Sequence, residues 1–347
     1  MTINALSVLD QSPMPEGSSA SEVLANTVEL AQLTERLGYR RYWLAEHHGT
    51  LGLAGSAPEI LIAHVAAHTT SIRVGSGGVM LSHYSPLKVA EQFHLLESLH
   101  PGRIDLGLGR APGGEPLTSI ALQRNREHPA GDDFLEQLAE LVAWFGGRFP
   151  EQHPFARLAA TPLPEGNPPI WLLSSSGYSA AVAGHYGMGL CFAHFISDEG
   201  GPAAVEHYRA RFTEAWPEDE PQATFAVGVI CAESDAEADE LATSADLWRL
   251  RSRRYNERGP VPSVASARAF PYSPTDRSFI EQSRQKLIVG SPGVVRERLE
   301  TLAAAYGAEE IVIVTVIHDH AARLRSYELL AETFIPSGAA AAGQVTA

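Results

Sequence analysis

The sequence of 347 residues predicts an α/β fold, a (β/α)8 TIM barrel, on three observations. Short apolar segments alternate with segments of helical periodicity along the whole chain, which is typical of βα units around a parallel sheet. The length is ordinary for a closed barrel with insertions. The turn after the first strand, at 10–15, contains no GxGxxG. That absence disfavours the main rival, a doubly wound sheet with a dinucleotide fingerprint.

The expected strands are short and apolar, as parallel strands covered on both faces tend to be. They lie at 6–9, 40–45, 74–81, 104–109, 169–173, 189–193, 224–231 and 310–316. Glycine and proline punctuate the helices between them: Gly38 ends the first helix, and Pro58, Pro86 and Pro292 each open one. The helices are expected at 18–37, 58–68, 87–99, 132–145, 179–186, 203–216, 235–255, 278–288, 292–306 and 321–334.

One segment, 256–276, departs from this alternation. It is rich in Pro, Ser and Arg and has little periodicity, which is typical of a functional or mobile loop. We therefore predict an insertion loop before the C-terminal helices. Together with this loop, residues 1–336 form one domain, and a disordered tail follows at 337–347.

The charge and the cysteines limit the partners and the compartment. A net charge of -15 argues against nucleic acid or an anionic membrane as partner. Cys191 and Cys231 lie in apolar strands, so we expect buried free thiols and a cytoplasmic protein. The N-terminus lacks a signal-peptide pattern, and no apolar run reaches the ~20 residues that span a bilayer. No Cys/His spacing indicates a metal site.

The third expected strand, 74–81, is almost bare of side chains where Ser76, Gly77 and Gly78 follow one another. Glycine weakens a strand and often marks a place where something large approaches the backbone. Either a flat ligand lies against this bare end, or the stretch is a glycine-rich turn without a ligand. A strained or cis peptide bond fits at Gly77–Gly78.

Distinctive polar residues follow two other strands, at the barrel end where TIM barrels place their chemistry. His47 and His48 follow the second strand, and histidine exchanges protons near neutral pH. The alternative is a hydrogen-bonded structural pair. Arg110, between Gly109 and Ala111, follows the fourth strand and is free to reach a phosphate with two hydrogen bonds. The alternative is a surface arginine.

The fifth strand runs into the segment 174–179, Ser-Ser-Ser-Gly-Tyr-Ser, which opens a helix. A helix N-terminus offers unpaired N–H groups and a partial positive charge, and the hydroxyls of Ser176 and Ser179 add donors. The alternative is an ordinary serine N-cap. Together, the bare strand, the arginine and this turn indicate a flat cofactor that carries a phosphate, and flavin mononucleotide (FMN) fits.

Several motifs resemble the bacterial luciferase-like monooxygenase family, and its single-component oxidoreductase branch most of all. The motifs are YWLAEHH at 42–48, VGSGGVML at 74–81, PGRIDLGLGR at 101–110, APGG at 111–114 and VGSPGVV at 289–295. The resemblance covers the chain from Leu6 to about Phe334. It implies a TIM barrel in which reduced FMN reacts with O2 through a flavin C4a-peroxide to oxidise a small organic substrate.

The resemblance also implies roles for particular residues. His47 matches the catalytic histidine, which transfers a proton and stabilises the peroxide. Gly77 and Gly78 match a pair joined by a cis peptide beneath the isoalloxazine ring. His194 falls near the substrate. The residues expected to bind the cofactor are Gly77, Gly78, Met80, Arg110, Ala111, Leu173, Ser174, Ser175, Ser176, Gly177, Tyr178 and Ser179.

The peroxide needs a site that excludes water, and 256–276 is the candidate lid. In that lid Arg268, Phe270 and Tyr272 would cover the flavin, unless the segment is a disordered surface loop. The expected electron donor is NAD(P)H, used directly or through a partner flavin reductase. A homodimer through the helices beside the second and third strands is expected by resemblance.

Two departures speak against light emission from a long aldehyde: Gly109 replaces the reactive cysteine of luciferase, and Ala193-His194 departs from the luciferase pattern. Two other functions remain open. One is hydride transfer with a deazaflavin, a sister branch of the same fold, against which the Glu46-His47-His48 motif and Arg110 speak. The other is a flavin-binding protein without turnover, against which the retention of His47 speaks.

Overall fold

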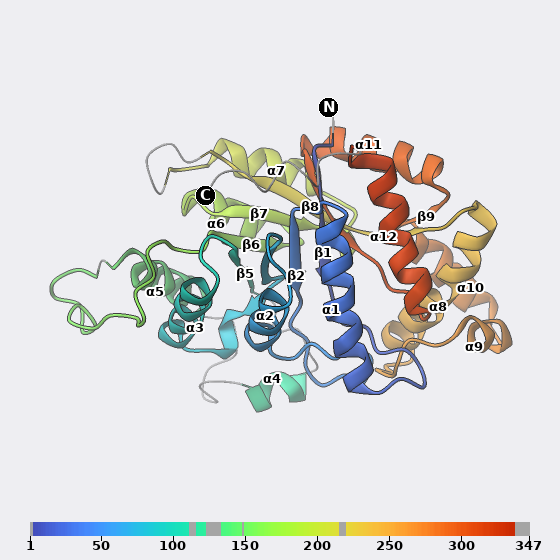
Figure 1. The fold of residues 1–347 in the computed structure, drawn as a ribbon, viewed down its shortest axis with the longest axis horizontal. Helices are drawn as coiled ribbons and strands as arrows, with labels where there is room; N and C mark the ends of the chain where they lie inside the picture. The colour runs from blue at the N-terminus through green and yellow to red at the C-terminus, as the bar shows by residue number, and fades with distance from the viewer. Residues whose placement is uncertain (1–2, 111–115, 123–132, 148, 215–219, 337–347) are drawn as a thin grey trace.

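The structure is a computed structural model, and it describes residues 3–110, 116–122, 133–147, 149–214 and 220–336. Eight parallel strands form a closed ring, which confirms the TIM barrel (Figure 1). The ring consists of β1 (Ala5–Asp10), β2 (Arg41–Leu44), β3 (Arg73–Ser76), β5 (Ile104–Gly109), β6 (Ile170–Ser174), β7 (Gly189–Ala193), β8 (Ala223–Cys231) and β10 (Glu310–Val314). It closes because β10 pairs with both β8 and β1.

The third strand of the ring is interrupted where the sequence is bare. A cis peptide bond joins Gly77 and Gly78, and the short β4 (Val79–Met80) resumes the strand by pairing with β5. The prediction of a cis peptide at this position is confirmed.

Helices surround the ring, with bounds close to those expected except that α7, expected to reach residue 216, ends at Ala210. They are α1 (Ala20–Arg36), α2 (Pro58–Ala67), α3 (Pro86–Leu99), α5 (Phe134–Gly146), α6 (Gly177–His185), α7 (Gly201–Ala210), α11 (Pro292–Tyr306) and α12 (His320–Phe334). Ser19 and Glu22 form a capping box on α1, and proline occupies the first turn of α2, α3 and α11. A short helix, α4 (Pro116–Leu122), lies apart from them at the edge of the molecule (Figure 1). None of the described helices is both long and apolar enough to cross a membrane.

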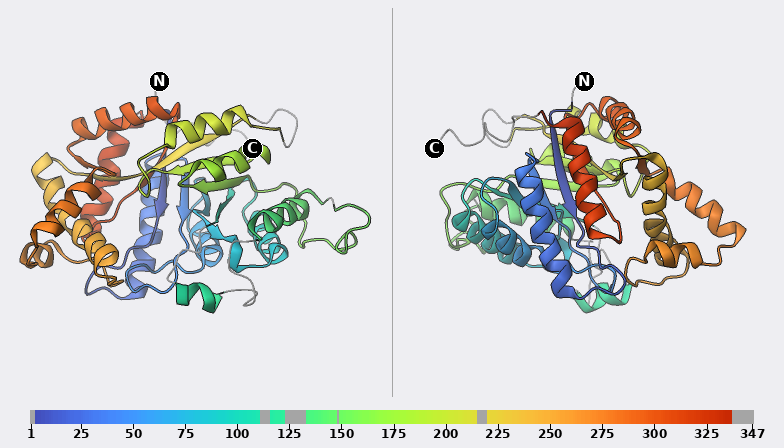
Figure 2. Two further views of the ribbon diagram at one scale, coloured as in Figure 1. Left: turned by 180° about the vertical axis from the view of Figure 1, so that it is seen from behind. Right: turned by 45° about the vertical axis from the view of Figure 1, so that its right-hand side comes forward.

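The prediction of a structureless insertion at 256–276 was wrong. The chain between β8 and α11 holds α8 (Asp235–Arg254), α9 (Val264–Ala269), α10 (Pro274–Arg284) and β9 (Leu287–Gly290). Ser263 caps α9, and Ser273 and Asp276 form a capping box on α10. The helix expected at 278–288 in fact ends at Arg284, and a strand that pairs with β8 follows it. These helices gather at one end of the molecule, opposite α5 (Figures 1 and 2).

Two apolar layers hold the barrel together. The larger lies between the ring and the helices, where the outward side chains of the strands pack. The smaller fills the barrel interior with Leu9, Trp43, Ala45, Trp171, Cys191, Ala226, Val312 and Val314. Cys191 and Cys231 are buried free thiols, as predicted.

A buried ionic network closes the barrel at the amino ends of its strands. The Arg41 guanidinium binds Glu310 at 2.8 Å and Asp105 at 3.0 Å, and it lies 4.6 Å from the ring of Trp171. Trp43 Nε1 donates to the same Asp105 carboxylate at 3.0 Å. Both acids are buried and share these donors, so the network occupies the barrel interior at the amino ends of the strands.

Candidate active site

The bare end of the third strand forms a ledge at the carboxyl side of the barrel. Gly77 and Gly78 are partly exposed, whereas Ser76 before them and Val79 after them are buried. A Cβ on Gly77 would overlap the Leu9 side chain and lie 3.1 Å from Trp43 Cβ. The ledge is therefore supported from within the barrel and reachable by solvent.

The ledge is equally well supported on the side of β5. A Cβ on Gly78 would lie 2.7 Å from the carbonyl oxygen of Gly107 and 2.7 Å from Leu173 Cδ1. Gly107 itself sits in β5 with no room for a side chain beneath Ser76. Only glycine fits at these positions without moving a neighbour. One face of the Gly77–Gly78 peptide is therefore packed against the barrel, and a planar group is able to approach only its solvent-exposed face.

Glu46 anchors the ledge to the end of the second strand, a role that the sequence analysis missed. Its buried carboxylate accepts the backbone N–H of Met80 at 2.8 Å, directly after the ledge. The other oxygen lies 2.6 Å from His48 Nε2 and accepts the Tyr84 hydroxyl at 2.7 Å. A buried carboxylate is stable only when it is paired in this way. His48 is therefore the hydrogen-bonded structural member of the histidine pair.

His47, the other member, is left free for chemistry. Its backbone N–H donates to the Gly55 carbonyl at 2.8 Å, which fixes the main chain. Its Nδ1 atom is shielded from solvent and has no hydrogen-bond partner among the described residues. Burial lowers the pKa of His47 to about 4, and the neighbouring His48 adds to the shift. The imidazole is therefore neutral at pH 7, with an unpaired Nδ1 atom.

The turn at 174–179 leads into α6, whose N-terminus is open. Ser176 is the N-cap residue, yet its side chain makes no capping hydrogen bond within the described structure. Ser175, Ser176 and Gly177 are exposed and Ser179 is buried. The Ser174 hydroxyl is used inside the turn, donating to the Ser176 carbonyl at 2.6 Å. An uncapped N-terminus that presents hydroxyls and N–H groups is suited to an anion, and the ordinary N-cap does not describe it.

Arg110 lies beside this N-terminus, as the sequence analysis expected. Its guanidinium carbon is 5.0 Å from the centre of the Tyr178 ring, on the first turn of α6. Both side chains are exposed, so the guanidinium is available to a ligand. Ala111, also expected to bind the cofactor, lies outside the described residues. The end of β5 and the start of α6 together form an anion seat, defined here as Arg110, Ser176 and the first turn of α6.

His194 does not face the mouth, which corrects its expected place near the substrate. Its Nδ1 atom lies 3.0 Å from the Tyr306 hydroxyl, and its ring packs near Phe225. Tyr306 and Phe225 belong to the layer between the barrel and the helices. The side chain is buried and held in that layer, so its role is structural.

The three expected lid residues also lie away from the ledge. Arg268 is exposed and pairs with Glu240 of α8 at 2.7 Å. Phe270 and Tyr272 pack on a cluster formed by α8, α9 and α10. The lid assignment of these side chains is therefore corrected: they attach the helices of the insertion to one another.

A different part of the insertion does reach the mouth. The Leu51 N–H donates to the Arg258 carbonyl at 2.9 Å, and Val261 pairs with Pro15 in the loop after β1. The Trp248 indole N–H of α8 donates to the Gly259 carbonyl at 3.1 Å. This segment, 256–262, connects α8 to the loops after β1 and β2. It is the first part of the expected lid at 256–276, and its contacts with these loops are main-chain hydrogen bonds, which leave no periodic signal in the sequence.

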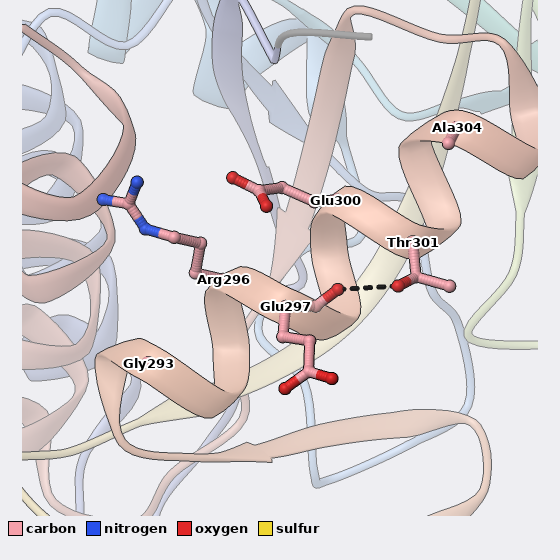
Figure 3. Close-up of a pocket in the computed structure, with 6 residues that line it drawn as sticks. All are labelled: Gly293, Arg296, Glu297, Glu300, Thr301 and Ala304. Atoms are coloured by element: carbon pink, nitrogen blue, oxygen red, sulfur yellow. Dashed lines mark hydrogen bonds between the residues drawn. The ribbon is translucent and has the colours of Figure 1, made fainter.

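A shallow depression on α11 is not part of this site. Figure 3 shows its lining residues, Gly293, Arg296, Glu297, Glu300, Thr301 and Ala304. All of them are exposed on the outer face of one helix. No strand end of the barrel contributes to it, so it lies apart from the ledge.

These residues are well suited to a flavin with a phosphate. The glycine ledge is a cradle that any Cβ would fill, and the anion seat lies at the neighbouring strand ends. The orphaned Nδ1 atom of His47 adds an unpaired polar group in the loop after β2. The fold and these residues define a TIM-barrel protein with a candidate site for a planar, anionic ligand at its mouth.

The particular family follows from comparison with known proteins. The model of the Luciferase-like monooxygenase family matches residues 1–309, and the chain belongs to that family. The chain is 48% identical over 330 residues to protein YwcH of Bacillus subtilis (strain 168), covering 95% of this chain and 99% of that protein. It is 39% identical over 333 residues to the N-acetyl-S-alkylcysteine monooxygenase of the same organism, covering 95% and 98%.

Solved structures agree with this assignment. The crystal structure of apo-MsnO8 superposes with a TM-score of 0.86 at 41% identity, covering 96% of this chain and 99% of that chain. The oxygenating constituent of 3,6-diketocamphane monooxygenase from Pseudomonas putida, solved in complex with FMN, gives a TM-score of 0.70 at 20% identity. It covers 97% of this chain and 99% of that chain, and at such identity the likeness shows the fold alone.

Proposed function

We propose that the chain is an FMN-dependent monooxygenase that uses reduced FMN and O2 to oxidise a small organic substrate. The observation that carries the proposal is the Gly77–Gly78 ledge, closed beneath by Leu9, Gly107 and Leu173 and open above. Membership of a monooxygenase family supports the reaction class. The similarity to an N-acetyl-S-alkylcysteine monooxygenase makes compounds of that class the first substrates to test.

The phosphate of FMN would be held at the anion seat. Arg110 offers its guanidinium, and the open first turn of α6 offers backbone N–H groups and the Ser176 and Ser179 hydroxyls. The ring would lie on Gly77 and Gly78, bordered by Met80 and Leu173. Ser174 would support the turn rather than bind, because its hydroxyl is already used.

Bound reduced FMN supplies the two electrons that let O2 be split between the substrate and water. The chain contributes a neutral imidazole at His47, whose unpaired Nδ1 atom would form a hydrogen bond with a bound ligand. Glu46 keeps the ledge and the histidine loop in register, since it binds Met80 and His48 together. We further propose that NAD(P)H provides the electrons, directly or through a partner flavin reductase.

A homodimer through α2 and α3 belongs to the same proposal. Ile60 on α2 and Leu95 and Leu99 on α3 are large apolar side chains exposed by 67%, 50% and 58%. Burial of such a face usually stabilises an assembly. Sedimentation velocity tests it: the proposal predicts a dimer that Leu95→Glu weakens, and a wild-type monomer at micromolar concentration would refute it.

The function is tested by titrating the purified protein with reduced FMN and, in parallel, with a reduced deazaflavin. We expect saturable binding of FMN, weaker binding of the deazaflavin, and O2 consumption that falls in His47→Ala. Tighter deazaflavin binding would indicate hydride transfer instead. O2 consumption that His47→Ala leaves unchanged would favour a binding protein without turnover, and no saturable FMN binding would dismiss the proposal.

A further inference from the structure

Helix α8 covers the β8 side of the barrel mouth instead of packing outside the ring. Alternate residues of a strand face the same side, and Ala226 lies inside the barrel. Gly228 and Ile230 therefore face the interior side of β8. Ile230 packs against Ala242 and Ala245 of α8. The next turn of the helix, with Trp248 and Arg249, thus descends toward the mouth.

The Arg249 guanidinium reaches this interior face with one of its nitrogen atoms unpaired. Its Nη2 atom is 3.6 Å from the position that a Cβ on Gly228 would take, so the bare strand makes room for it. Its Nη1 atom is shielded from solvent and makes no hydrogen bond to any residue in the described ranges. The arginine is therefore a half-buried cation with at least one unsatisfied donor nitrogen, Nη1.

The neighbouring acid is already engaged elsewhere. Asp246 accepts Arg284 Nε at 2.8 Å on both oxygens and pairs with Arg284 Nη2 at 2.7 Å. Arg253 and Arg284 add further positive charge near Arg249. Burial lowers the pKa of Arg249, which Asp246 offsets in part. A guanidinium nevertheless stays charged at neutral pH, so Arg249 places a positive charge that Asp246 only partly offsets on the interior face of β8.

A buried, unpaired charge is costly for folding and is kept where it binds something. Arginine is suited to carboxylates because two parallel N–H groups match the two oxygens. The position of Arg249 relative to the ledge also suits a residue that binds the substrate. Around the ring β8 is separated from β3 by β5, β6 and β7 on one side and by β2, β1 and β10 on the other. Arg249 therefore lies across the mouth from the ledge.

We propose that Arg249 binds the carboxylate of an organic acid substrate and so points the rest of the molecule toward the ledge. The inference rests on the proposed function, since the ledge must hold the flavin for this orientation to matter. The anion seat for the FMN phosphate lies at β5 and β6, so the two anions would occupy separate strand ends.

The binding test compares matched acids and amides. Calorimetry measures benzoate against benzamide, and N-acetyl-S-methylcysteine against its carboxamide, with and without FMN. In the wild type we expect at least one acid to bind roughly 10- to 100-fold more tightly than its amide, the usual range for a charged hydrogen bond. Arg249→Met should abolish that preference and leave FMN affinity unchanged.

A stability measurement separates a binding role from a structural one. Because the wild-type charge is unpaired, Arg249→Met should melt at the same temperature as the wild type or higher. The matched control, Arg284→Met, removes a paired arginine nearby and should melt lower, since it leaves Asp246 buried alone. A drop in Arg249→Met as large as that in the control would overturn the proposal.

Three other results would also overturn it: no acid binds, acids and amides bind alike, or Arg249→Met retains the preference. Reduced FMN affinity in Arg249→Met would place this arginine on the flavin instead. Failure of the proposed function has a different signature, because the wild type would then bind an acid at Arg249 and not bind FMN.

Discussion

Replacing Gly78 with alanine tests the ledge most directly. The added Cβ would lie 2.7 Å from the Gly107 carbonyl oxygen, 2.8 Å from its carbonyl carbon and 2.7 Å from Leu173 Cδ1. The leucine is able to rotate away. The Gly107 backbone is not, because it belongs to β5 and is paired with Trp171 of β6. Something in the ring must therefore shift.

The expected cost follows from two opposing effects. Overpacking of a tight site costs about 1–3 kcal/mol. Alanine also restricts the unfolded chain more than glycine does, which returns about 0.4–1 kcal/mol. Gly78→Ala should therefore lose about 1–2 kcal/mol of unfolding free energy, measured by urea denaturation, and bind FMN more weakly because the ledge is displaced.

Gly109→Ala is the matched control in the neighbouring strand. Its Cβ would meet only the Val79 carbonyl oxygen, at 4.0 Å, which is an ordinary contact. This variant should be as stable as the wild type or more stable by up to ~1 kcal/mol. Equal denaturation midpoints for Gly78→Ala and Gly109→Ala would refute the close packing beneath the ledge.

Three further changes test the surroundings of the ledge. Arg110→Ala should weaken FMN binding by about 1.5–3 kcal/mol in a fluorescence titration, while Arg268→Ala, on the far side of the insertion, should leave it unchanged. Glu46→Gln should lower the unfolding free energy, measured by urea denaturation, by about 1–3 kcal/mol, because the buried carboxylate serves three donors; an unaltered unfolding free energy would remove the anchor. Folding lowers the pKa of His47 from 6.5 to about 4. The native state therefore keeps its full stability above pH 6.5 and loses up to about 3 kcal/mol as the pH falls to 4 and below. An NMR titration midpoint above 6 would contradict this.

The barrel itself was predictable from the sequence because its strands are buried on both faces. Such strands appear as apolar runs, and the sixth expected strand, at 189–193, coincides with β7 (Gly189–Ala193). Proline then marked where two helices begin, α2 at Pro58 and α11 at Pro292. Local composition alone carried this information.

The insertion was harder to predict because its order comes from contacts distant in sequence. Helical periodicity shows that α8 has a buried stripe, but not that the stripe covers the inner face of β8. The caps at Ser263 and Ser273 were readable, and the Pro- and Ser-rich composition around them obscured the signal. The strand Leu287–Gly290 was read as a helix end because four residues carry too little periodicity.

The candidate site was predicted in its backbone features and less well in its side chains. Bare glycines and an open helix N-terminus are visible in the sequence, so the ledge and the anion seat were found. His194 was misplaced although strand parity held the answer: Phe192 faces the outer layer, and the residue two positions later faces the same way. The anchoring role of Glu46 was not predicted, because its hydrogen bond to Met80 joins two strands that are distant in the sequence.

The ionic network of Arg41, Asp105 and Glu310 decides from which end the barrel interior is reached. Its charged side chains occupy the interior at the amino ends of the strands, so a small molecule reaches the ledge from the carboxyl end. The loops after β1 and β2 and the segment 256–262 lie at that end. A ligand of the ledge would therefore enter and leave past the same loops.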